Sequence, residues 1–340
     1  MKNKFSDQLF STAGLFTLSI RLVLGWTYFS AFWRRLVLDN KLIPEEAGYI
    51  GEKFNHFLPN ALGIKPLIEF LVSHPDALQA SMIAFTVIEA IVGGLVMLGL
   101  FSRLMGIGVF SLAMGILLGS GWLGTTCLDE WQIGVLGIAG GFTLFLTGSG
   151  MFSVDDMLIR KEAPLTRKKW FQWLGSGVLP IRHLEKFVLC CSLLIFGLTL
   201  YTNQYFHGGV FGTLHNKSVK PKIEISDASF VNSQLKFQVY RTEGADVYGS
   251  FLIGIQVLNA ENRLVFEMNA DALSTFDERK IHNYYVAKVK TGKHSMIIPL
   301  GAKADLTLDI PADRLAKTDR YTLKLIDISG AEWRSTIANN

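Results

Sequence analysis

The stretch from Gln79 to Leu100 reads QASMIAFTVIEAIVGGLVMLGL, and it decides the class of this protein. It contains a single charged residue, Glu89, and it is long enough to cross a bilayer as a helix, which takes about 20 apolar residues. Over all 340 residues, 49% are hydrophobic and only 18% are charged. This balance favours an integral membrane protein over a soluble one.

Four further apolar runs are predicted to cross the bilayer. The run from Leu9 to Phe32 is too long for a cleavable signal peptide, and no small-residue cleavage site follows it. The runs from Met105 to Gly121 and from Trp131 to Gly148 are short and rich in glycine, which lets helices pack closely. The last run covers Phe187 to Tyr205, so the sequence predicts a bundle of five transmembrane helices.

The basic residues of the short loops predict the orientation, because lysine and arginine collect on the cytoplasmic side of a membrane. They precede the first span, separate the second from the third, and crowd the connection between the fourth and the fifth. These residues are Lys2, Lys4, Arg103, Arg160, Lys161, Arg167, Lys168, Lys169, Arg182 and Lys186. We expect a multi-pass protein of the cytoplasmic (inner) membrane, with a cytoplasmic N-terminus and a periplasmic or otherwise extracytoplasmic C-terminal domain.

After Gly208-Gly209 the pattern changes from long apolar runs to alternation. Apolar residues take every second position, as at Leu235, Phe237 and Val239 and at Tyr321, Leu323 and Leu325. Such runs, separated by turn residues, are typical of strands with one buried face. We predict an all-β immunoglobulin-like sandwich that docks a partner or caps the membrane site.

The chain is therefore expected to have two parts. Residues 1–184 form an α-helical membrane domain with four transmembrane helices and an outer loop at 33–78. Residues 185–340 contain the fifth transmembrane helix, at 187–206, and the β-sandwich, at 217–340.

The outer loop contains two apolar-rich segments, Pro44 to Leu58 and Pro66 to Val72. Each starts with a proline, which suits the first turn of a helix. We expect two short helices that cover the outer mouth of the bundle.

Composition and motifs also argue against several classes of function. The net charge of +4 comes without a basic stripe interleaved with aromatic residues, so no nucleic-acid partner is expected. The cysteines Cys127, Cys190 and Cys191 are too few for a disulfide framework or a zinc site. Haem, flavin and iron–sulfur motifs are not found in the sequence, so no metal or bound redox cofactor is predicted.

Two charged residues fall inside predicted spans, where each costs roughly 2.5–3.5 kcal/mol on insertion scales. Arg21 lies near the middle of the first span and Glu89 near the middle of the second. Because these spans run in opposite directions, we predict an intramembrane ion pair between the two residues. The sequence leaves open whether the pair only locks two helices or takes part in function.

A second polar group is predicted at the outer mouth. Arg34 and Arg35 end the first span, and Trp122 and Trp131 would line an aromatic rim. Guanidinium groups present a planar fork of donors to oxyanions, so these four residues are candidates for binding a small anionic substrate. The alternative is that the arginines reach lipid phosphates.

The loop WLGTTCLDEW, residues 122–131, adds the candidate catalytic residues Cys127, Asp129 and Glu130. Nearby arginines favour the thiolate form of a cysteine, which is the nucleophile. Cys127 is then a candidate nucleophile and the two carboxylates are candidates for proton transfer. The alternative is that Cys127 is a small packing residue.

Three stretches resemble the DoxX/DoxD membrane proteins. GLVMLGLFSRLMGI, at 94–107, resembles their GLxLLLGLFTRLAA segment, and GSGMFSVDDML, at 148–158, resembles their closing GxGxYSLDxxL. RLVLGWTYFSAFWRRL, at 21–36, resembles their first helix, which begins with arginine and ends in a basic residue. The order of the two parts resembles DoxD, over roughly residues 5–180, fused to DoxA, over roughly 185–340.

DoxD and DoxA are small subunits of thiosulfate:quinone oxidoreductase. The resemblance implies that two thiosulfates are oxidised to tetrathionate and two electrons pass to a membrane quinone. By position, Arg21, Arg34 and Arg35 match basic positions of the first helix, Arg103 matches the arginine of FTRL, and Asp155 matches the aspartate of SLD. Because the last two fall at the cytoplasmic end, we interpret them as a structural pair that closes the inner side. The double arginine departs from the lysine usual in the wider group, which leaves the substrate open.

The implied partners are the lipid bilayer, a membrane quinone and a small sulfur oxyanion. In the mechanism this suggests, Cys127 or a bound thiosulfate attacks, quinone accepts the electron pair, and Glu130 or Asp129 handles protons. One alternative is a non-catalytic, redox-associated scaffold that docks a protein partner through its β domain. Another is an anion transporter, against which the lack of an inverted repeat argues. The sequence does not determine whether the protein is a homo-oligomer.

Overall fold

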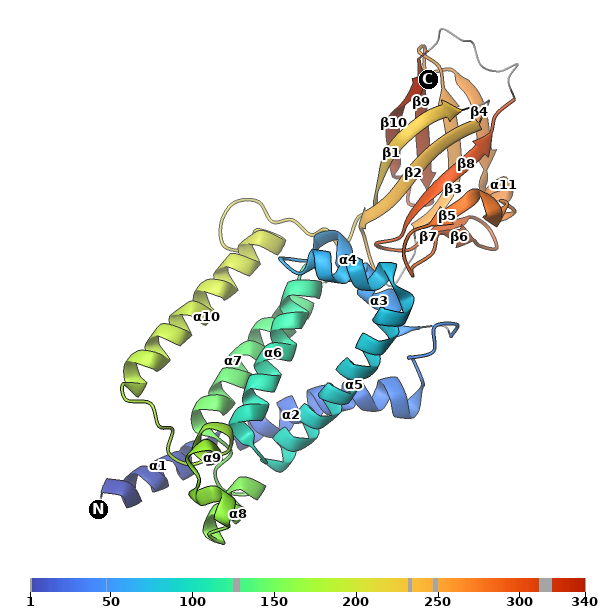
Figure 1. The fold of residues 1–340 in the computed structure, drawn as a ribbon. Helices are drawn as coiled ribbons and strands as arrows, with labels where there is room; N and C mark the ends of the chain where they lie inside the picture. The colour runs from blue at the N-terminus through green and yellow to red at the C-terminus, as the bar shows by residue number, and fades with distance from the viewer. Residues whose placement is uncertain are drawn as a thin grey trace. The chain divides into compact units, whose positions relative to one another are not determined.

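A computed structural model describes residues 2–46, 48–124, 129–231, 234–246, 250–311 and 320–339. The chain divides into two compact units (Figure 1). The membrane unit contains Met1–Ala47, Gln79–Gly121 and Leu128–His215, and the β unit contains Gly48–Leu78, Trp122–Cys127 and Asn216–Asn340.

Helices form most of the membrane unit. They are α1 (Lys2–Phe16), α2 (Leu18–Phe32), the π-helical turn η1 (Trp33–Leu38), α5 (Pro75–Leu98), α6 (Ser102–Ser120), α7 (Asp129–Thr147), α8 (Val154–Arg160), η3 (Pro164–Arg167), α9 (Lys169–Leu174) and α10 (Leu184–His207). Among the described residues, α5, α6 and α10 are each long and apolar enough to span a membrane. The pair Leu9–Phe16 and Leu18–Leu38 passes the same test together, bent by 52°. The protein is therefore a multi-pass membrane protein.

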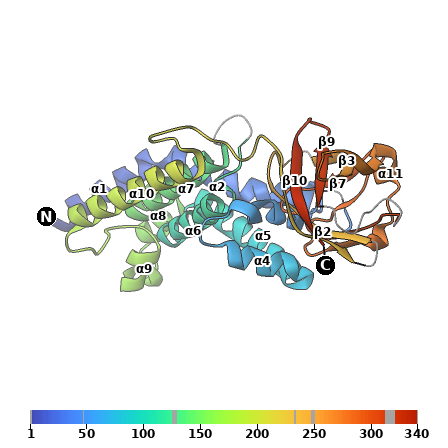
Figure 2. The same cartoon turned by 90° about the horizontal axis from the view of Figure 1, so that it is seen from above.

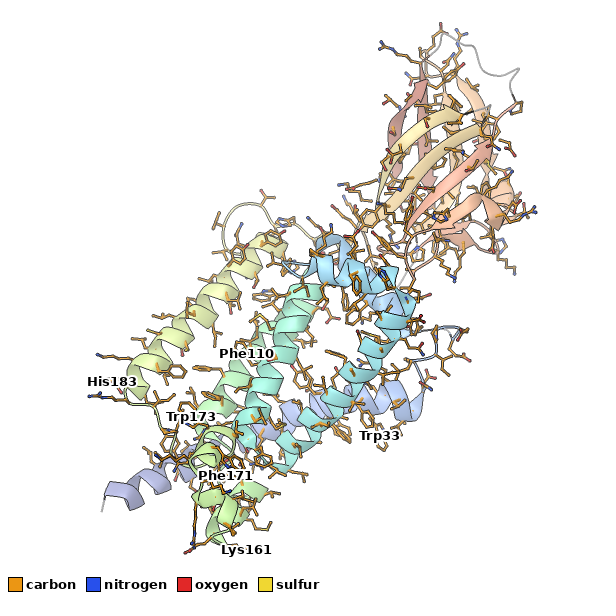
Figure 3. All side chains as sticks on the ribbon, viewed as in Figure 1. Trp33, Phe110, Lys161, Phe171, Trp173 and His183 are labelled. Atoms are coloured by element: carbon orange, nitrogen blue, oxygen red, sulfur yellow. The ribbon has the colours of Figure 1, made fainter. Side chains whose placement is uncertain are left out.

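Glycines bring these helices close together. A Cβ on Gly93 of α5 would lie 2.4 Å from the backbone nitrogen of Phe29 in α2. A Cβ on Gly141 of α7 would lie 2.6 Å from the backbone nitrogen of Phe110 in α6, which is labelled in Figure 3. Small residues at such contacts allow the backbone approach on which helix packing in membranes depends.

The strands of the β unit form a sandwich. They are β1 (Lys222–Val231), β2 (Gln234–Glu243), β3 (Ser250–Leu258), β4 (Leu264–Asn269), β5 (Ile281–Asn283), β6 (Lys290–Thr291), β7 (Met296–Ile298), β8 (Lys303–Asp309), β9 (Tyr321–Asp327) and β10 (Glu332–Asn339), with α11 (Ala270–Ser274) and η4 (Glu278–Lys280) between strands. The strand order is β5-β8-β2-β1-β10-β9-β3-β7-β6, and β4 also pairs with β3. The paired strands β9 and β10 are labelled next to each other in Figure 2.

This order confirms the immunoglobulin-like prediction. Strands β1, β2, β8 and β5 correspond to one sheet of that fold, and β3, β9 and β10 to the other. Strands β1 and β10 pair in parallel and join the two sheets. The predicted alternation supplies the core, because Leu235, Phe237, Val239, Leu323 and Leu325 are all buried.

The β unit also includes the helices of the long loop. These are α3 (Ile50–Phe57), η2 (Leu58–Asn60) and α4 (Lys65–Ser73). The two expected helices exist, although α3 begins after Pro44 rather than at it. Both pack with the strands, so the loop is structurally part of the β unit.

Candidate functional site

A buried ion pair joins η1, the turn that follows α2, to α5. Arg35 Nη1 lies 2.5 Å from Glu89 Oε2 and donates to Thr86 Oγ1 at 3.1 Å. Its guanidinium also lies over the ring of Phe85, at 5.8 Å from the centroid. Glu89 is only 4% exposed and the Arg35 side chain 14%, so the two charges depend on each other.

The predicted pair of Arg21 with Glu89 is therefore wrong. Arg21 donates from Nη1 to Ser149 O and from Nη2 to Phe152 O, both at 2.8 Å, while Glu89 is bonded to Arg35. Glu89 does pair with an arginine, as predicted, but this arginine is Arg35 of η1 and not Arg21 of α2.

Helix register explains this difference. Phe29 of α2 lies against Gly93 of α5, and Arg21 lies close to Gly99, just beyond the end of α5. Since α2 and α5 run in opposite directions, Glu89 then lies level with residues after Phe29. Arg21 is in the first turn of α2, not in the middle of a continuous span, because α1 ends at Phe16.

The two arginines lie on a π-helical turn, which the sequence analysis missed. η1 begins at Trp33, labelled in Figure 3, and continues α2 to Leu38. Arg34 is exposed and donates from Nε to Ser30 O at 3.2 Å, whereas Arg35 is half-buried. π-helical turns are rare in proteins, and those that do occur are often found at functional sites. We therefore treat η1 as part of the candidate site.

The two candidate rim tryptophans are both hydrogen-bonded. Trp122 is buried in the β unit, and its Nε1 donates to Phe57 O at 3.2 Å. Trp131 is half-buried in the membrane unit, and its Nε1 donates to Thr202 Oγ1 of α10 at 3.0 Å. Each therefore fixes a helix or loop in its own unit.

The candidate catalytic residues are described only in part. Cys127 lies outside the described residues, as does the side chain of Asp129. Asp129 begins α7 and Glu130 follows in its first turn, where it is half-buried. The catalytic assignment of these three residues stays a prediction.

At the opposite end of the membrane unit, Asp155 is the centre of a buried polar cluster. Its carboxylate accepts from the backbone N–H groups of Phe101 and Ser102, at 2.9 and 3.0 Å. It also accepts from the hydroxyls of Ser102 and Ser176, at 2.9 and 2.8 Å. These bonds satisfy the first N–H groups of α6, which the helix itself cannot pair.

Arg103 lies in the same region but bonds to carbonyl oxygens. It donates to Phe145 O at 3.0 Å and also to Gln172 O and Gly177 O. The link to Asp155 runs through the 172–177 segment, because Ser176 of that segment bonds to the carboxylate. Arg103 and Asp155 thus both hold the 172–177 segment in place, and they are linked through it and not by a direct bond.

An apolar groove runs between α2 and α7, with a volume of about 470 Å³. Its lining is mostly apolar, with two hydroxyl groups: Ser19, Ile20, Val23, Leu24, Leu136, Ala139, Gly140 and Thr143. Its chemistry suits an acyl or prenyl chain. Among the described residues, no three or more histidine, cysteine, aspartate or glutamate side chains lie together as a metal site would need.

Sequence reasoning also missed His207, the last residue of α10. It is buried, and its Nε2 lies 3.0 Å from the carbonyl oxygen of Gly121. The signal in the sequence was a histidine just beyond the apolar run that ends at Tyr205.

Two family models match the chain in tandem. The model described as TQO small subunit DoxD matches residues 16–182, and the model described as TQO small subunit DoxA matches residues 206–336. The first match includes Arg35, Glu89, Arg103 and Asp155. The second includes strands β1 to β9 and most of β10. No solved structure matches the chain.

Proposed function

We infer the function from family membership: this chain belongs to the DoxD and DoxA families, small subunits of thiosulfate:quinone oxidoreductase, in tandem. A role related to that enzyme follows. We propose that the chain itself oxidises thiosulfate and reduces a membrane quinone. The observation that carries the proposal is the arginine pair on η1, of which Arg35 is bonded to a buried carboxylate within the DoxD match.

The proposed reaction balances without a resident redox cofactor. Two thiosulfates, one quinone and two protons give one tetrathionate and one hydroquinone. The sulfur–sulfur bond of tetrathionate forms as two electrons leave the thiosulfates, and both electrons enter the quinone. The electrons must therefore pass directly from thiosulfate sulfur to a quinone held close to it, or pass through an intermediate in which the sulfur is covalently bound to the protein.

The charges on and beside η1 suit a small dianion. Arg34 and Arg35 contribute two positive charges, and Glu89 offsets one of them. Arg34 also lies near enough to interact electrostatically with Glu89. The exposed Arg34 guanidinium is the first contact for the anion, and Arg35 is held in place by its carboxylate partner. Arginine suits this task because its fork of donors matches oxyanion geometry.

Cys127 is the proposed nucleophile. Its thiolate bonds to the sulfane sulfur of one thiosulfate while two electrons and two protons convert quinone to hydroquinone. The sulfane sulfur of a second thiosulfate then attacks the bound sulfane sulfur, which releases tetrathionate and regenerates the thiolate. Glu130 or Asp129 transfers protons during the first step.

Replacing Cys127 with serine is expected to lower thiosulfate-driven quinone reduction at least a hundredfold. A serine hydroxyl cannot form the sulfur–sulfur bond, while its size leaves packing nearly unchanged. Cys190→Ser, at an exposed position of α10, is the matched control and should retain full activity. If Cys127→Ser were fully active, the covalent route would be ruled out and direct coupling of two arginine-held thiosulfates would replace it.

The reaction is proposed to take place at the extracytoplasmic face. The basic segment between α7 and α10 favours a cytoplasmic position for that side, and the end of α10 and the β unit are then expected on the other side. Val210 is exposed just after α10. With the chain's own three cysteines replaced by serine, Val210→Cys should be labelled by a membrane-impermeant maleimide in intact cells, and labelling only after lysis would reverse the orientation.

The apolar groove between α2 and α7 supports the quinone part of the proposal. A lipid-soluble quinone needs a slot for its prenyl tail as well as a polar contact for its head group. The groove supplies apolar surface of that kind within the membrane unit.

A further inference from the structure

The α3–α4 segment contacts the strands of the β unit through a buried asparagine. Asn55 is 0% exposed, and its Nδ2 donates to Gly301 O at 2.6 Å. Its Oδ1 accepts from the backbone N–H of Ala287 at 3.3 Å. A Cβ on Gly301 would lie 2.1 Å from Asn55 O, so only glycine allows this approach. The contact is closely fitted.

Further polar bonds extend the contact on both sides of Asn55. Asn60 donates from Nδ2 to Thr242 O at 2.9 Å and accepts from Lys217 Nζ at 3.0 Å. The hydroxyl of Tyr285 donates to Glu69 Oε1 at 2.8 Å. The apolar side chains that pack between these bonds are Leu58, Ala61, Ile68, Val72, Tyr285 and Val286.

A second part of the contact holds the start of the loop that leads to Cys127. Ser218 Oγ accepts from the backbone N–H of Gly124 at 3.0 Å, and Asn216 Nδ2 donates to Gly124 O at 2.6 Å. On the other side of this loop, Trp122 donates to Phe57 O of α3. Both backbone groups of Gly124 are thus held by residues that precede β1.

All of these bonds except Trp122 to Phe57 join the stretch matched by DoxD to the stretch matched by DoxA. We infer that the β domain binds the DoxD part non-covalently, as a separate subunit would, through the 48–78 segment and residues 122–124. This DoxD–DoxA surface holds the domain, and the peptide connection after α10 is dispensable for holding it. The inference does not depend on the proposed reaction.

Cutting the connection tests this inference directly. Residues 209–214 are exposed, so a protease site inserted there can be cleaved in the purified protein. After complete cleavage, shown on a denaturing gel, the β fragment is expected to co-elute with the membrane fragment. Separation of the two fragments on size exclusion would overturn the inference.

A pair of variants then assigns the binding to the contact described. Asn55→Ala with Asn60→Ala removes side-chain bonds from the surface and is expected to speed dissociation of the cut fragment at least tenfold. Asn259→Ala is the matched control, because the side-chain oxygen of Asn259 accepts bonds from its own exposed turn and lies outside this contact. Equal dissociation of both variants would contradict the assignment, and circular dichroism of the released fragment shows whether it stays folded.

A different observation, at the end of α10, points to a second site. His207 is 1% exposed, and its Nε2 lies 3.0 Å from Gly121 O. A carbonyl only accepts, so the hydrogen of the neutral imidazole is on Nε2 and the lone pair is on Nδ1. Within the described part of the chain, neither this Nδ1 nor Asn203 Oδ1, one turn earlier, has a hydrogen-bond partner, although both atoms are buried.

Two buried acceptors without a donor call for a ligand that donates. The site lies beside the end of α6, since Gly121 directly follows that helix, and Trp131 of α7 bonds to Thr202 of α10 close by. The rest of α10 exposes large apolar side chains: Leu189, Leu193, Leu194, Phe196, Leu200, Tyr201 and Tyr205. A ligand dissolved in the membrane can therefore approach along this helix, and a hydroquinone carries the hydroxyl groups that these acceptors need.

We propose that His207 Nδ1 and Asn203 Oδ1 form the polar contact for the quinone head group, an assignment that rests on the proposed function. In the forward reaction, protonated His207 gives its Nδ1 proton to one quinone oxygen as the electron pair arrives from the Cys127 thiolate and the first thiosulfate. The other quinone oxygen takes its proton from Glu130 or Asp129, and water then reprotonates His207. The product hydroxyl then donates back to Nδ1.

His207→Gln tests this site with two electron acceptors. Ferricyanide accepts electrons without protons, so thiosulfate-driven ferricyanide reduction should persist while reduction of decylubiquinone falls at least tenfold. His215→Gln, at an exposed position nearby, is the control and should leave both rates unchanged. Equal rates for wild type and His207→Gln, or an equal loss with both acceptors, would overturn the proposal.

A binding measurement separates failure of this site from failure of the proposed function. Decylubiquinol should raise the thermal unfolding temperature of the wild-type protein but not that of His207→Gln, whether or not thiosulfate is turned over. A wild-type protein that is inactive with both acceptors would refute the proposed function. An equal shift in both proteins would refute the site, and a bound water would then explain the two acceptors.

Discussion

Replacing Arg35 with alanine is expected to abolish thiosulfate-driven quinone reduction and to destabilise the membrane unit. Glu89 would be left as a buried carboxylate without its partner, since Arg35 supplies the 2.5 Å bond to it. Removing one member of a buried ion pair costs about 3–5 kcal/mol of unfolding free energy. Thermal unfolding in detergent and the initial rate of quinone reduction measure the two effects separately.

Two further variants separate the structural effect from the functional one. Arg35→Ala with Glu89→Ala removes both charges and should recover much of the stability while activity stays lost. Arg34→Ala removes the exposed guanidinium and should raise the KM for thiosulfate at least tenfold with unchanged stability. Full activity in the Arg35–Glu89 double variant would contradict a role for this pair in binding the anion.

Replacing Asp155 with alanine is expected to prevent stable folding of the membrane unit. Four donors, three of them at the start of α6, would lose a buried charged acceptor. Each hydrogen bond to a charged group contributes about 1.5–3 kcal/mol, so even with partial compensation the loss is about 4 kcal/mol or more. The charge of Asp155 also interacts favourably with Arg21 and Arg103, which would remain buried without it. Yield of monodisperse protein and its unfolding temperature measure the effect.

The neighbouring aspartate is the matched control. Asp156 is partly exposed and pairs with Arg160 at 2.7 Å, one turn along α8. Such i,i+4 pairs contribute about 0.3–0.5 kcal/mol, so Asp156→Ala should express and unfold like the wild type. Similar behaviour of the two variants would contradict the central place given to Asp155.

Much of the fold could be predicted because it depends on local patterns. The apolar runs locate α5, α6, α7 and α10, and the alternation at Leu235 to Val239 identifies strands of a sandwich. The break between α1 and α2 could not be predicted. Thr17 is an ordinary residue within an apolar run, and its hydroxyl bonds to Gly14 O at 3.1 Å at the end of α1. Gly14 in turn packs against the backbone of Gly150, which is distant in sequence.

Part of the candidate site could also be predicted from local sequence patterns. Arg34, Arg35 and Glu89 were visible as charges in or beside apolar runs, but the pairing depends on helix register. Membership of the 48–78 segment in the β unit depends on tertiary contacts such as Asn55 to Gly301. Neither residue carries a local signal for such a bond.

The most direct test of the central claim is to measure both products with the purified protein. Thiosulfate and decylubiquinone are added to the full chain in detergent, and tetrathionate and quinol are quantified together. The account predicts one tetrathionate for each quinol, with both products missing in Arg35→Ala. A folded wild-type protein that yields neither product would contradict it and favour a non-catalytic scaffold that needs a further subunit.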